Sequence, residues 1–457
     1  MEYDVAVIGG GAAGMMAAIT AAQAGAHTVL IEGGERLGKK LFITGKGRCN
    51  LTNACDTAEF FDHVNANPRF LYSPIYDFDA AAVMQFVESL GCPLKTERGE
   101  RVFPVSDRSA DVINALERAL RKYGVDVKKN TKAAGLLRES AAEENPKKYR
   151  VTGVFLDNGD KISAKAVIAA TGGVSYSSTG SDGSFFQSLM TLGHTVTALH
   201  PALVPLVLKE ETASQMMGLS LKNVSVTLKC EKKKYKEGPG EMLFTHFGVS
   251  GPLILTLSSI YSRNYGGRSN MLTESFSIKK EYAKKFDKEN DFGHNLKNYV
   301  EGKEADLYID LKPGMTEEEI DERLIREISE NRKKNYSNLI SSFVPGQMKD
   351  VFPIIAGIDP SKKADQISRE ERRITAETLK KMHFTVIGTR DFNEAIVTSG
   401  GINVKEVDPS TMQSKLADGL YICGEMLDTD AQTGGYNLQT AWSTGHLAGL
   451  CAAGADM

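Results

Sequence analysis

The sequence predicts an α/β fold that contains a Rossmann-like nucleotide-binding domain, and three local patterns support this prediction. A glycine-rich turn joins a short apolar strand to a helix at the N-terminus. A buried strand at residues 166–170 ends at Thr171-Gly172-Gly173, and a second glycine-rich turn precedes the last helix. At 457 residues the chain is long enough for two or three domains and for a core that encloses a ligand.

The composition limits the kinds of partner. Hydrophobic residues at 41% and charged residues at 25% are ordinary for a globular protein and argue against disorder. The 55 Lys and Arg residues against 58 Asp and Glu residues give a net charge of −3, so there is no overall positive field to hold nucleic acid or an anionic membrane. We therefore expect a small-molecule partner, no nucleic acid and no membrane. The oligomeric state stays open.

Cysteine spacing and the N-terminal segment bear on the compartment. None of the six cysteines forms a CxxC pair, which argues against a zinc ribbon or a thioredoxin-type dithiol, and we expect no metal site. Glycines break the uncharged run at residues 5–31, which therefore indicates buried structure rather than a membrane span. Glu2 stands where a signal peptide carries basic residues, so we expect a cytoplasmic protein.

The first 32 residues have the pattern of a βαβ unit. The expected strand, turn, helix and strand lie at residues 3–8, 9–14, 15–24 and 27–31. Glu32 follows the second strand, 18 residues after Gly14, where a carboxylate can accept hydrogen bonds from ribose hydroxyls. Its negative charge disfavours a 2′-phosphate, so the predicted dinucleotide is FAD or NAD rather than NADP.

Each residue of the glycine-rich turn has a predicted role. Gly9 permits the tight turn, Gly11 lets a pyrophosphate approach the backbone, and Gly14 lets the helix pack closely on the sheet. Ala12 and Ala13 begin the helix, whose free N–H groups would face the phosphates. We therefore predict that all five residues contact the cofactor.

Two further segments are candidates for cofactor contact. Residues 33–53 combine glycines with polar side chains, which suits a flat flavin ring and its ribityl chain. A buried strand at 419–424 leads to the glycine-rich turn 433–439 and to a helix, whose N-terminal amides can stabilise negative charge on a reduced flavin. The predicted contacts in these segments and after the strand at 166–170 are Lys40, Gly45, Gly47, Arg48, Cys49, Asn50, Thr52, Gly172, Gly424, Glu425, Gly435, Asn437 and Leu438.

Four segments resemble one known family. The start GGGAAG, the loop GKGRCNLTN, the segment THFGVSGP at residues 245–252 and the ending GEMLDTDAQTGGYNLQTAWSTG are similar to the BaiN-like family of FAD-dependent oxidoreductases. That family includes bile-acid-type reductases and proteins described as aminoacetone oxidases. The resemblance spans the whole chain, with departures at Lys46, where glycine is usual in the family, and at Ala431.

The resemblance implies a FAD-binding domain of the two-dinucleotide-binding type, assembled from residues 1–195 and 384–457. Between these segments it implies a β-rich, barrel-like domain at 196–315 and a small helical domain at 316–383. It also implies that the backbone of Ala133 contacts the adenine.

Patterns in the middle of the chain agree with this organisation. Antiparallel strands are expected at residues 125–137, 149–155, 223–230 and 242–247, and strands leading back to the FAD domain at 384–387 and 394–401. The Lys-rich segment at 232–236 is expected to form a solvated hairpin tip. Thr316, followed by three glutamates, is expected to open a helix that runs to Asn331.

FAD is the expected cofactor, and NAD(P)H is expected only as a transient electron donor because the chain has no second GxGxxG motif. We predict reduction of an activated C=C bond in an apolar, steroid- or bile-acid-like enone by hydride transfer from flavin N5. The candidate catalytic residues are His246, Tyr436 and Arg48, with Tyr176 as a further candidate. His246 has an alternative role as a structural hydrogen-bonding residue.

Other functions stay open at this point. A flavin-dependent amine oxidase is the main alternative, because the family resemblance covers both reactions. Cys49 and Cys55 suggest a disulfide reductase, although their spacing is C-x5-C rather than C-x4-C. A flavin-dependent protein that binds or modifies RNA is a further alternative, which would require a basic face.

Overall fold

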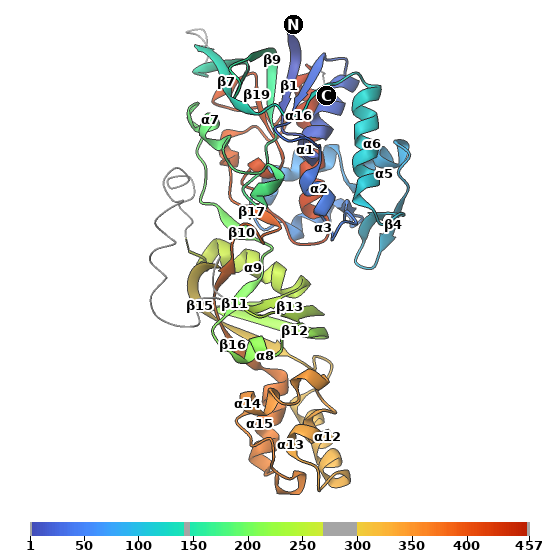
Figure 1. Ribbon diagram of the computed structural model, residues 1–457, viewed down its shortest axis with the longest axis vertical. Coiled ribbons are helices and arrows are strands. Elements are labelled where there is room, and N and C mark those ends of the chain that lie inside the picture. The colour runs from blue at the N-terminus through green and yellow to red at the C-terminus, as the bar shows by residue number, and fades with distance from the viewer. Residues whose placement is uncertain (1, 141–146, 268–298, 455–457) are drawn as a thin grey trace. The chain divides into compact units, whose positions relative to one another are not determined.

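The computed structural model describes residues 2–140, 147–267 and 299–454, which form two compact units (Figure 1). Unit 1 contains the described residues up to 200 and from 396 onward, and unit 2 contains those from 201 to 395. The N-terminal nucleotide-binding pattern and the C-terminal glycine-rich turn therefore belong to one unit. Within the described ranges, no helix combines the length and the apolar character needed to cross a bilayer.

A parallel sheet is the framework of unit 1. Its parallel strands are β1 (Tyr3–Ile8), β2 (Thr28–Ile31), β6 (Asp126–Lys128), β9 (Lys161–Ala169) and β19 (Leu420–Ile422). β1 pairs in parallel with β2 and β9, β6 pairs with β2, and β19 pairs with β9. β1 and β2 are almost completely buried, which explains why their sequences are apolar runs rather than alternating patterns.

Helices α1 (Ala12–Gln23) and α16 (Tyr436–Ala452) bring the two ends of the chain together (Figure 1). A Cβ atom on Gly445 would lie 2.4 Å from the Ala13 carbonyl oxygen, and one on Gly449 would lie 2.4 Å from that of Ala17. Because the two backbones approach so closely, no larger side chain fits at these positions. The small residues of both helices thus allow distant parts of the sequence to form one unit.

Antiparallel strands extend the sheet of unit 1. β7 (Ala133–Ser140) pairs with β8 (Tyr149–Leu156), β8 pairs with β9, and β18 (Ala417–Asp418) pairs in parallel with β8. The single strand expected at residues 125–137 needs correction, because β6 joins the parallel sheet and the antiparallel strand begins only at β7. Between them, Thr131 N donates to Glu32 O at 2.9 Å, which ties this segment to the end of β2.

Smaller elements complete unit 1. They are α2 (Lys39–Ile43), β3 (Thr52–Asn53), α3 (Thr57–Phe60), α4 (Tyr72–Asp77), α5 (Ala80–Ser89), β4 (Leu94–Glu97), β5 (Arg101–Pro104), α6 (Ser109–Lys122), α7 (Phe186–Met190) and β17 (Val397–Ser399). β3, β5 and β4 form a small antiparallel sheet in that order. This sheet extends the β4–β5 hairpin towards the polar loop that precedes β3.

Unit 2 contains a closed barrel. Its strands, in barrel order, are β11 (Leu206–Leu208), β14 (Gly248–Ser250), β13 (Lys233–Phe244), β12 (Ser220–Cys230), β15 (Tyr299–Asp310) and β16 (Met382–Arg390). The expected β-rich domain is therefore present, but its boundary differs. β16 closes the barrel by pairing with both β15 and β11, so residues 384–395 belong to unit 2 and not to the FAD domain.

The Lys-rich segment also differs from its prediction. Lys233 pairs with Cys230, so the hairpin turn consists of Glu231 and Lys232, and residues 233–236 are the start of β13 rather than the tip. The side chains of Lys233, Lys234 and Lys236 are nevertheless exposed, as expected for a solvated charge run.

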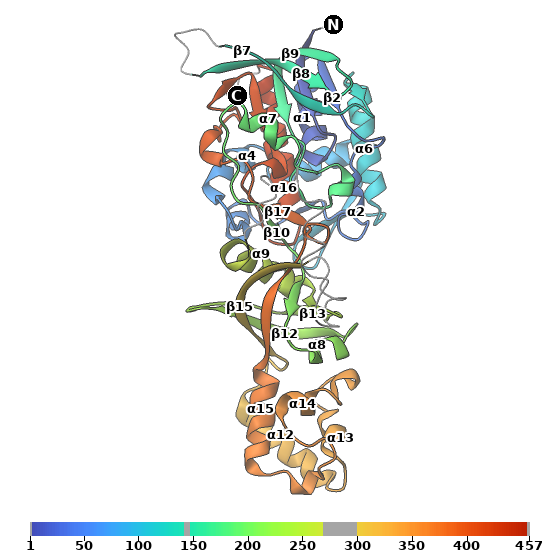
Figure 2. The same ribbon diagram turned by 60° about the vertical axis from the view of Figure 1, so that its left-hand side comes forward.

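Helices complete unit 2 (Figure 2). They are α8 (Thr212–Gln215), α9 (Pro252–Tyr265), α12 (Glu317–Glu330), α13 (Tyr336–Ile340), α14 (Phe352–Ala356) and α15 (Arg369–Lys380). α12 begins where predicted, with a capping box between Thr316 and Glu319. Ile320, Leu379 and the barrel residue Phe384 belong to one hydrophobic core, so the segment expected as a separate helical domain shares a core with the barrel.

Candidate functional site

The strands β1, β2, β9 and β19 are parallel, so their carboxyl ends lie at the same edge of the sheet. The segments that follow these ends contain Gly9, Glu32, Gly172 and Gly424. In open parallel sheets, ligands bind at the carboxyl edge, where loops and helix N-termini provide polar groups. The structure therefore brings together the segments in which the sequence placed the cofactor contacts.

The first turn is shaped by glycine. Gly9 has φ 101°, and its N–H donates to the Ile31 carbonyl at 2.8 Å. A Cβ on Gly14 would lie 1.8 Å from the Gly9 carbonyl oxygen, so only glycine fits there. A Cβ on Gly11, by contrast, would meet no heavy atom within 4 Å. Gly11 is the N-cap of α1, so open space lies beside the first amides of this helix, which Ala12 and Ala13 begin.

Glu32 is held by backbone amides on both of its carboxylate oxygens. Oε2 accepts from Gly10 N at 2.8 Å and Oε1 from Gly34 N at 2.7 Å. These two bonds fix the carboxylate at the end of β2, and each oxygen keeps a lone pair for another donor. The carboxylate thus lies where the sequence placed it, and it keeps acceptor capacity for a ribose hydroxyl.

A polar network joins four segments near the carboxyl edge. Lys40 Nζ donates to Glu425 Oε2 at 2.9 Å and to Ser175 Oγ at 3.0 Å. The other oxygen of Glu425 accepts from Thr398 N at 2.8 Å and from Ser175 Oγ at 2.9 Å. Gly172, with φ 78°, lies beside the same carboxylate. Lys40 and Glu425, both predicted cofactor contacts, are thus partners of one another.

The loop that precedes β3 is an unusual left-handed turn. Gly45, Lys46, Gly47 and Cys49 have φ values of 61°, 58°, 83° and 61°. Lys46 therefore occupies a conformation that favours glycine. Asn50 follows, and its Oδ1 is buried and has no hydrogen-bond partner among the described residues. Such an atom is rare in folded proteins and points to a missing donor.

Arg48 extends from this turn towards the β4–β5 hairpin. Its Nε donates to Asp107 Oδ1 at 2.8 Å and its Nη2 to Glu97 Oε1 at 2.5 Å. The guanidinium carbon lies 4.1 Å from the centre of the Phe103 ring. These contacts raise the pKa of Arg48 through its bonds to Glu97 and Asp107, and they engage the side chain that the sequence offered as a catalytic or flavin-binding group.

The start of α16 is fixed against β3. Gly435, the N-cap, has φ 105°, and a Cβ there would lie 2.4 Å from the Thr52 carbonyl carbon. Thr52 Oγ1 donates to Gln439 Oε1 at 2.5 Å. Asn437 closes the preceding loop, because its Oδ1 accepts from Ala431 N at 2.9 Å and its Nδ2 donates to Ala431 O at 2.8 Å. Leu438 is half-buried in the first turn of the helix.

Tyr436 is a buried phenol at the first position of α16. Its ring stacks on His63, with centroids 4.3 Å apart, and meets Phe60 edge-on at 5.7 Å. Burial, the charge of Glu59 and the neighbouring Cys55 thiol raise the pKa of Tyr436 above its usual range, with burial the largest cause. The phenol is therefore neutral at physiological pH, and its raised pKa makes it a weaker acid than a free tyrosine.

The other predicted residues occupy varied positions. His246 lies in unit 2, in the exposed turn between β13 and β14, edge-on to Phe247 at 4.8 Å. Ala133 is the half-buried first residue of β7 and pairs with Leu156. Tyr176 is half-buried, with φ 49°. Gly424 has φ 70° and donates from its N–H to Thr444 Oγ1 at 3.0 Å.

Several partners of the predicted residues were not identified from the sequence. They are Ser175, Thr398, His63, Glu97 and Asp107. Each reaches its partner across a long sequence separation, and none belongs to a spaced motif. Ser175 alone carried a signal, because it closely follows the predicted turn Gly172-Gly173.

The residues present fit a flavin dinucleotide. Open space at Gly11 can admit a phosphate to the amides of α1, and Glu32 can accept from a ribose. Asn50 Oδ1 is a buried acceptor that a bound group with a donor would satisfy. Among the described residues, no three His, Cys, Asp or Glu side chains gather as a metal-binding group.

Comparison with known proteins agrees with this geometry. The family model "HI0933-like protein Rossmann domain" matches residues 3–451. The chain belongs to this family. It is 30% identical over 451 residues to the 3-dehydro-bile acid delta(4,6)-reductase of Clostridium scindens, covering 98% of each chain. It is 26% identical over 450 residues to the ribosomal RNA dihydrouridine synthase of Haemophilus influenzae, covering 97% of each.

A solved structure supports the fold. The 3-ketosteroid delta1-dehydrogenase from Sterolibacterium denitrificans aligns over 99% of both chains with a TM-score of 0.50 and 13% identity. The predicted α/β, Rossmann-type flavoprotein fold is confirmed, and the protein is a FAD-dependent oxidoreductase.

Proposed function

We propose that this protein reduces a C=C bond conjugated to a carbonyl group in an apolar, steroid- or bile-acid-like enone. The observation that carries the proposal is the full-length similarity, at 30% identity, to a reductase whose name specifies the delta(4,6) bonds of a 3-dehydro-bile acid. A 3-oxo group in conjugation with such bonds makes the β-carbon of the first bond and the δ-carbon of the second electrophilic, so either carbon can accept a hydride.

The site residues support the binding steps of this reaction. Glu32 and the first amides of α1 would hold the ribose and phosphates, and Asn50 would accept one further hydrogen bond. Bound FAD supplies the hydride chemistry. The amides at the start of α16 are available to stabilise negative charge beside them, because Gly435 opens the helix there.

The reaction also needs one proton at the α-carbon of the enone. Tyr436 supports this role, since its phenol is neutral and sits at the first position of α16. Its phenol lies beside the Cys55 thiol and feels the charge of Glu59, whose side chain is 61% exposed. The Tyr436→Phe variant should bind FAD normally and should transfer electrons to an enone about a hundredfold more slowly.

A substrate panel tests the proposal. The reduced holoenzyme is mixed without oxygen with a steroid 4,6-dien-3-one, with the corresponding saturated ketone and with an isolated alkene. The proposal expects a product two mass units heavier from the dienone only. Rapid reduction of the oxidised holoenzyme by small primary amines, with no product from any enone, would instead identify an amine oxidase.

The electron donor is a separate part of the proposal. We propose NADH or NADPH as a transient donor that binds, transfers its hydride and departs, which agrees with the absence of a second GxGxxG motif from the sequence. Bleaching of the flavin band by either nucleotide under nitrogen would support this role. Bleaching by dithionite but by neither nucleotide would exclude it.

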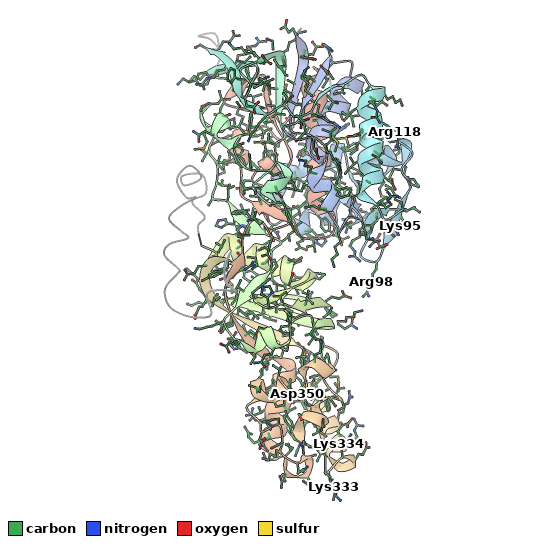
Figure 3. The ribbon with its side chains drawn as sticks, viewed as in Figure 1. Lys95, Arg98, Arg118, Lys333, Lys334 and Asp350 are labelled. Carbon is green, nitrogen blue, oxygen red and sulfur yellow. The ribbon has the colours of Figure 1, made fainter. Side chains whose placement is uncertain are left out.

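RNA is a second candidate substrate, favoured by the similarity to a ribosomal RNA dihydrouridine synthase. Uracil also contains a C=C bond conjugated to a carbonyl, so the chemistry is related. The charge balance favours the small molecule. The helical segment of unit 2, residues 312–381, contains 14 Lys and Arg against 13 Asp and Glu, so it has little net positive charge to attract RNA phosphates. Figure 3 labels part of this mixed surface, with Lys333, Lys334 and Asp350. Formation of dihydrouridine in ribosomal RNA by the reduced enzyme would favour the second candidate.

A further inference from the structure

We propose that Arg48 is a positioning residue. With Lys95, Glu97, Asp107 and Phe103 it would hold the turn at residues 44–50 in the conformation in which Asn50 accepts a hydrogen bond from the bound flavin nucleotide. We call these five side chains the Arg48 cluster. The proposal rests on the flavin contact proposed for this turn and adds how the turn keeps its shape.

The turn needs support from outside itself. Lys46 and Cys49 both have positive φ, at 58° and 61°, although each carries a Cβ that disfavours the left-handed region. Non-glycine residues persist in this region when surrounding contacts fix them, and such residues gather at ligand-binding turns. Cys49 gains part of this support by complete burial.

The Arg48 cluster supplies a second support. Asp107 accepts from Arg48 Nε at 2.8 Å through Oδ1 and from Lys95 Nζ at 2.7 Å through Oδ2. Glu97 accepts from Arg48 Nη2 at 2.5 Å and lies 3.4 Å from Lys95 Nζ. The two cations and two carboxylates balance in charge. Figure 3 labels Lys95 on β4, with Arg98 at the tip of the same hairpin.

The cluster is linked to Asn50 through rigid backbone contacts. Arg48 is two residues before Asn50, and its guanidinium stacks on the buried ring of Phe103 in β5. The neighbouring residue of β5, Val102, accepts from Leu51 N at 2.9 Å. β5 therefore contacts the chain on both sides of Asn50. A Cβ on Gly45 would lie 3.0 Å from Asn50 N, so the turn also packs directly against the asparagine backbone.

Arg48 would affect flavin binding through the side chain of Asn50. Its Oδ1 is buried and has no hydrogen-bond partner in the described part of the chain. An acceptor in this state is unfavourable unless a donor arrives with a ligand. The flavin nucleotide carries such donors on its ring and its ribityl chain. The rigid turn would therefore keep this acceptor in place before binding.

A double-mutant cycle on the holoenzyme tests the inference. The variants Arg48→Met, Asn50→Ala and their combination are compared by FAD dissociation constant and by the visible circular dichroism of the bound flavin. Each single variant should weaken FAD binding about tenfold, and the combination should be no weaker than about tenfold because both act through one contact. Additive losses, near a hundredfold, would overturn the proposal.

Control variants separate positioning from general damage. Arg101→Met alters an exposed arginine on β5 whose Nε donates to Arg98 O, and it should leave FAD affinity and the flavin dichroism unchanged. Asp107→Asn keeps the size of the side chain but weakens the charge pairing, and it should reproduce part of the Arg48→Met effect on both readouts. If Arg48→Met does not fold, Asp107→Asn takes its place in the comparison.

These variants test the assignment of the flavin site separately from the positioning role of Arg48. If Glu32→Ala loses FAD while Arg48→Met and Asp107→Asn bind it as tightly as the parent with an unchanged dichroism, the flavin assignment stands and the positioning role is wrong. If Glu32→Ala also binds FAD normally, the assignment of the nucleotide site itself is wrong.

Discussion

The turn at residues 9–14 and the turn at residues 44–50 both contribute to the candidate flavin site, but they hold their shapes in different ways. In the first, the left-handed residue is Gly9, which packs closely against the backbone of both Gly14 and Ala170. In the second, Lys46 and Cys49 are left-handed although both carry side chains. Contacts from β4, β5 and the following loop surround this second turn.

The difference shows which turn conformation can be predicted from the local sequence. Glycine makes the left-handed conformation of the first turn accessible at little cost, so this conformation can be predicted from the six residues of the turn. The second turn depends on Glu97, Phe103 and Asp107, which are distant in the sequence. The first turn should therefore be sensitive to the volume of single residues, and the second to the loss of distant charges.

The largest expected effect comes from the contact between Gly14 and Gly9. Gly14→Ala places a Cβ 1.8 Å from the Gly9 carbonyl oxygen, so we expect a loss of about 3 kcal/mol in the free energy of unfolding and no retained FAD. Gly11→Ala is the matched control, because its Cβ meets open space. It should keep the apoprotein's melting temperature and lose FAD affinity. Equal melting temperatures for both variants would show that the first turn tolerates volume.

Loss of the Glu32 carboxylate should have the next largest effect. Glu32→Ala removes an acceptor for the ribose, and charged hydrogen bonds are worth about 1.5–3 kcal/mol, so FAD affinity should fall about tenfold to a hundredfold. Glu35→Ala changes an exposed glutamate three residues later and should have no effect. Isothermal titration of the apoproteins with FAD compares the two. Equal affinities would exclude Glu32 as a nucleotide contact.

A smaller effect of opposite sign is expected in the second turn. Lys46→Gly relieves a left-handed side chain at φ 58° and should raise the free energy of unfolding by about 0.5–1 kcal/mol, after allowing for the greater freedom of glycine in the unfolded chain. Lys46→Ala removes the charge but keeps the Cβ, so it should bring no gain. Denaturant titration of both apoproteins measures this. An equal gain in both variants would attribute the effect to the loss of charge.

The smallest effect is expected at Cys55, beside Tyr436. Burial is the main cause that raises the pKa of Cys55 to about 11, so its thiol stays protonated at physiological pH and is a poor nucleophile. Cys49 is completely buried, and burial raises the pKa of its thiol as well. Cys55→Ser should therefore keep FAD and most of the turnover. Complete loss of turnover with FAD still bound would support a dithiol mechanism.

The comparison also explains how much the sequence could predict. The βαβ unit, the glycine-rich turn and the position of Glu32 after β2 follow from local patterns, and the structure has them where they were expected. The capping box of α12 is equally local. Such features need only a few neighbouring residues to specify them, so they are visible without a fold.

The rest depended on pairing between distant segments. The role of Arg48 could not be assigned because its partners, Glu97 and Asp107, carry no motif. The boundary at residue 384 was misplaced because β16 is apolar like a strand of either domain, and only its pairing with β11 and β15 assigns it to the barrel. The ion pair between Lys40 and Glu425 could not be predicted either, because the two residues lie far apart in the sequence.

The most direct test of the proposed reaction is a single-turnover measurement. The holoenzyme is reduced under nitrogen and mixed with a steroid 4,6-dien-3-one while the flavin absorption band is followed. We expect the band to return as the dienone is consumed and one C=C bond becomes saturated, with a much slower return in Tyr436→Phe. A band that stays bleached in the presence of every enone, while oxygen restores it, would contradict the assignment as a C=C reductase.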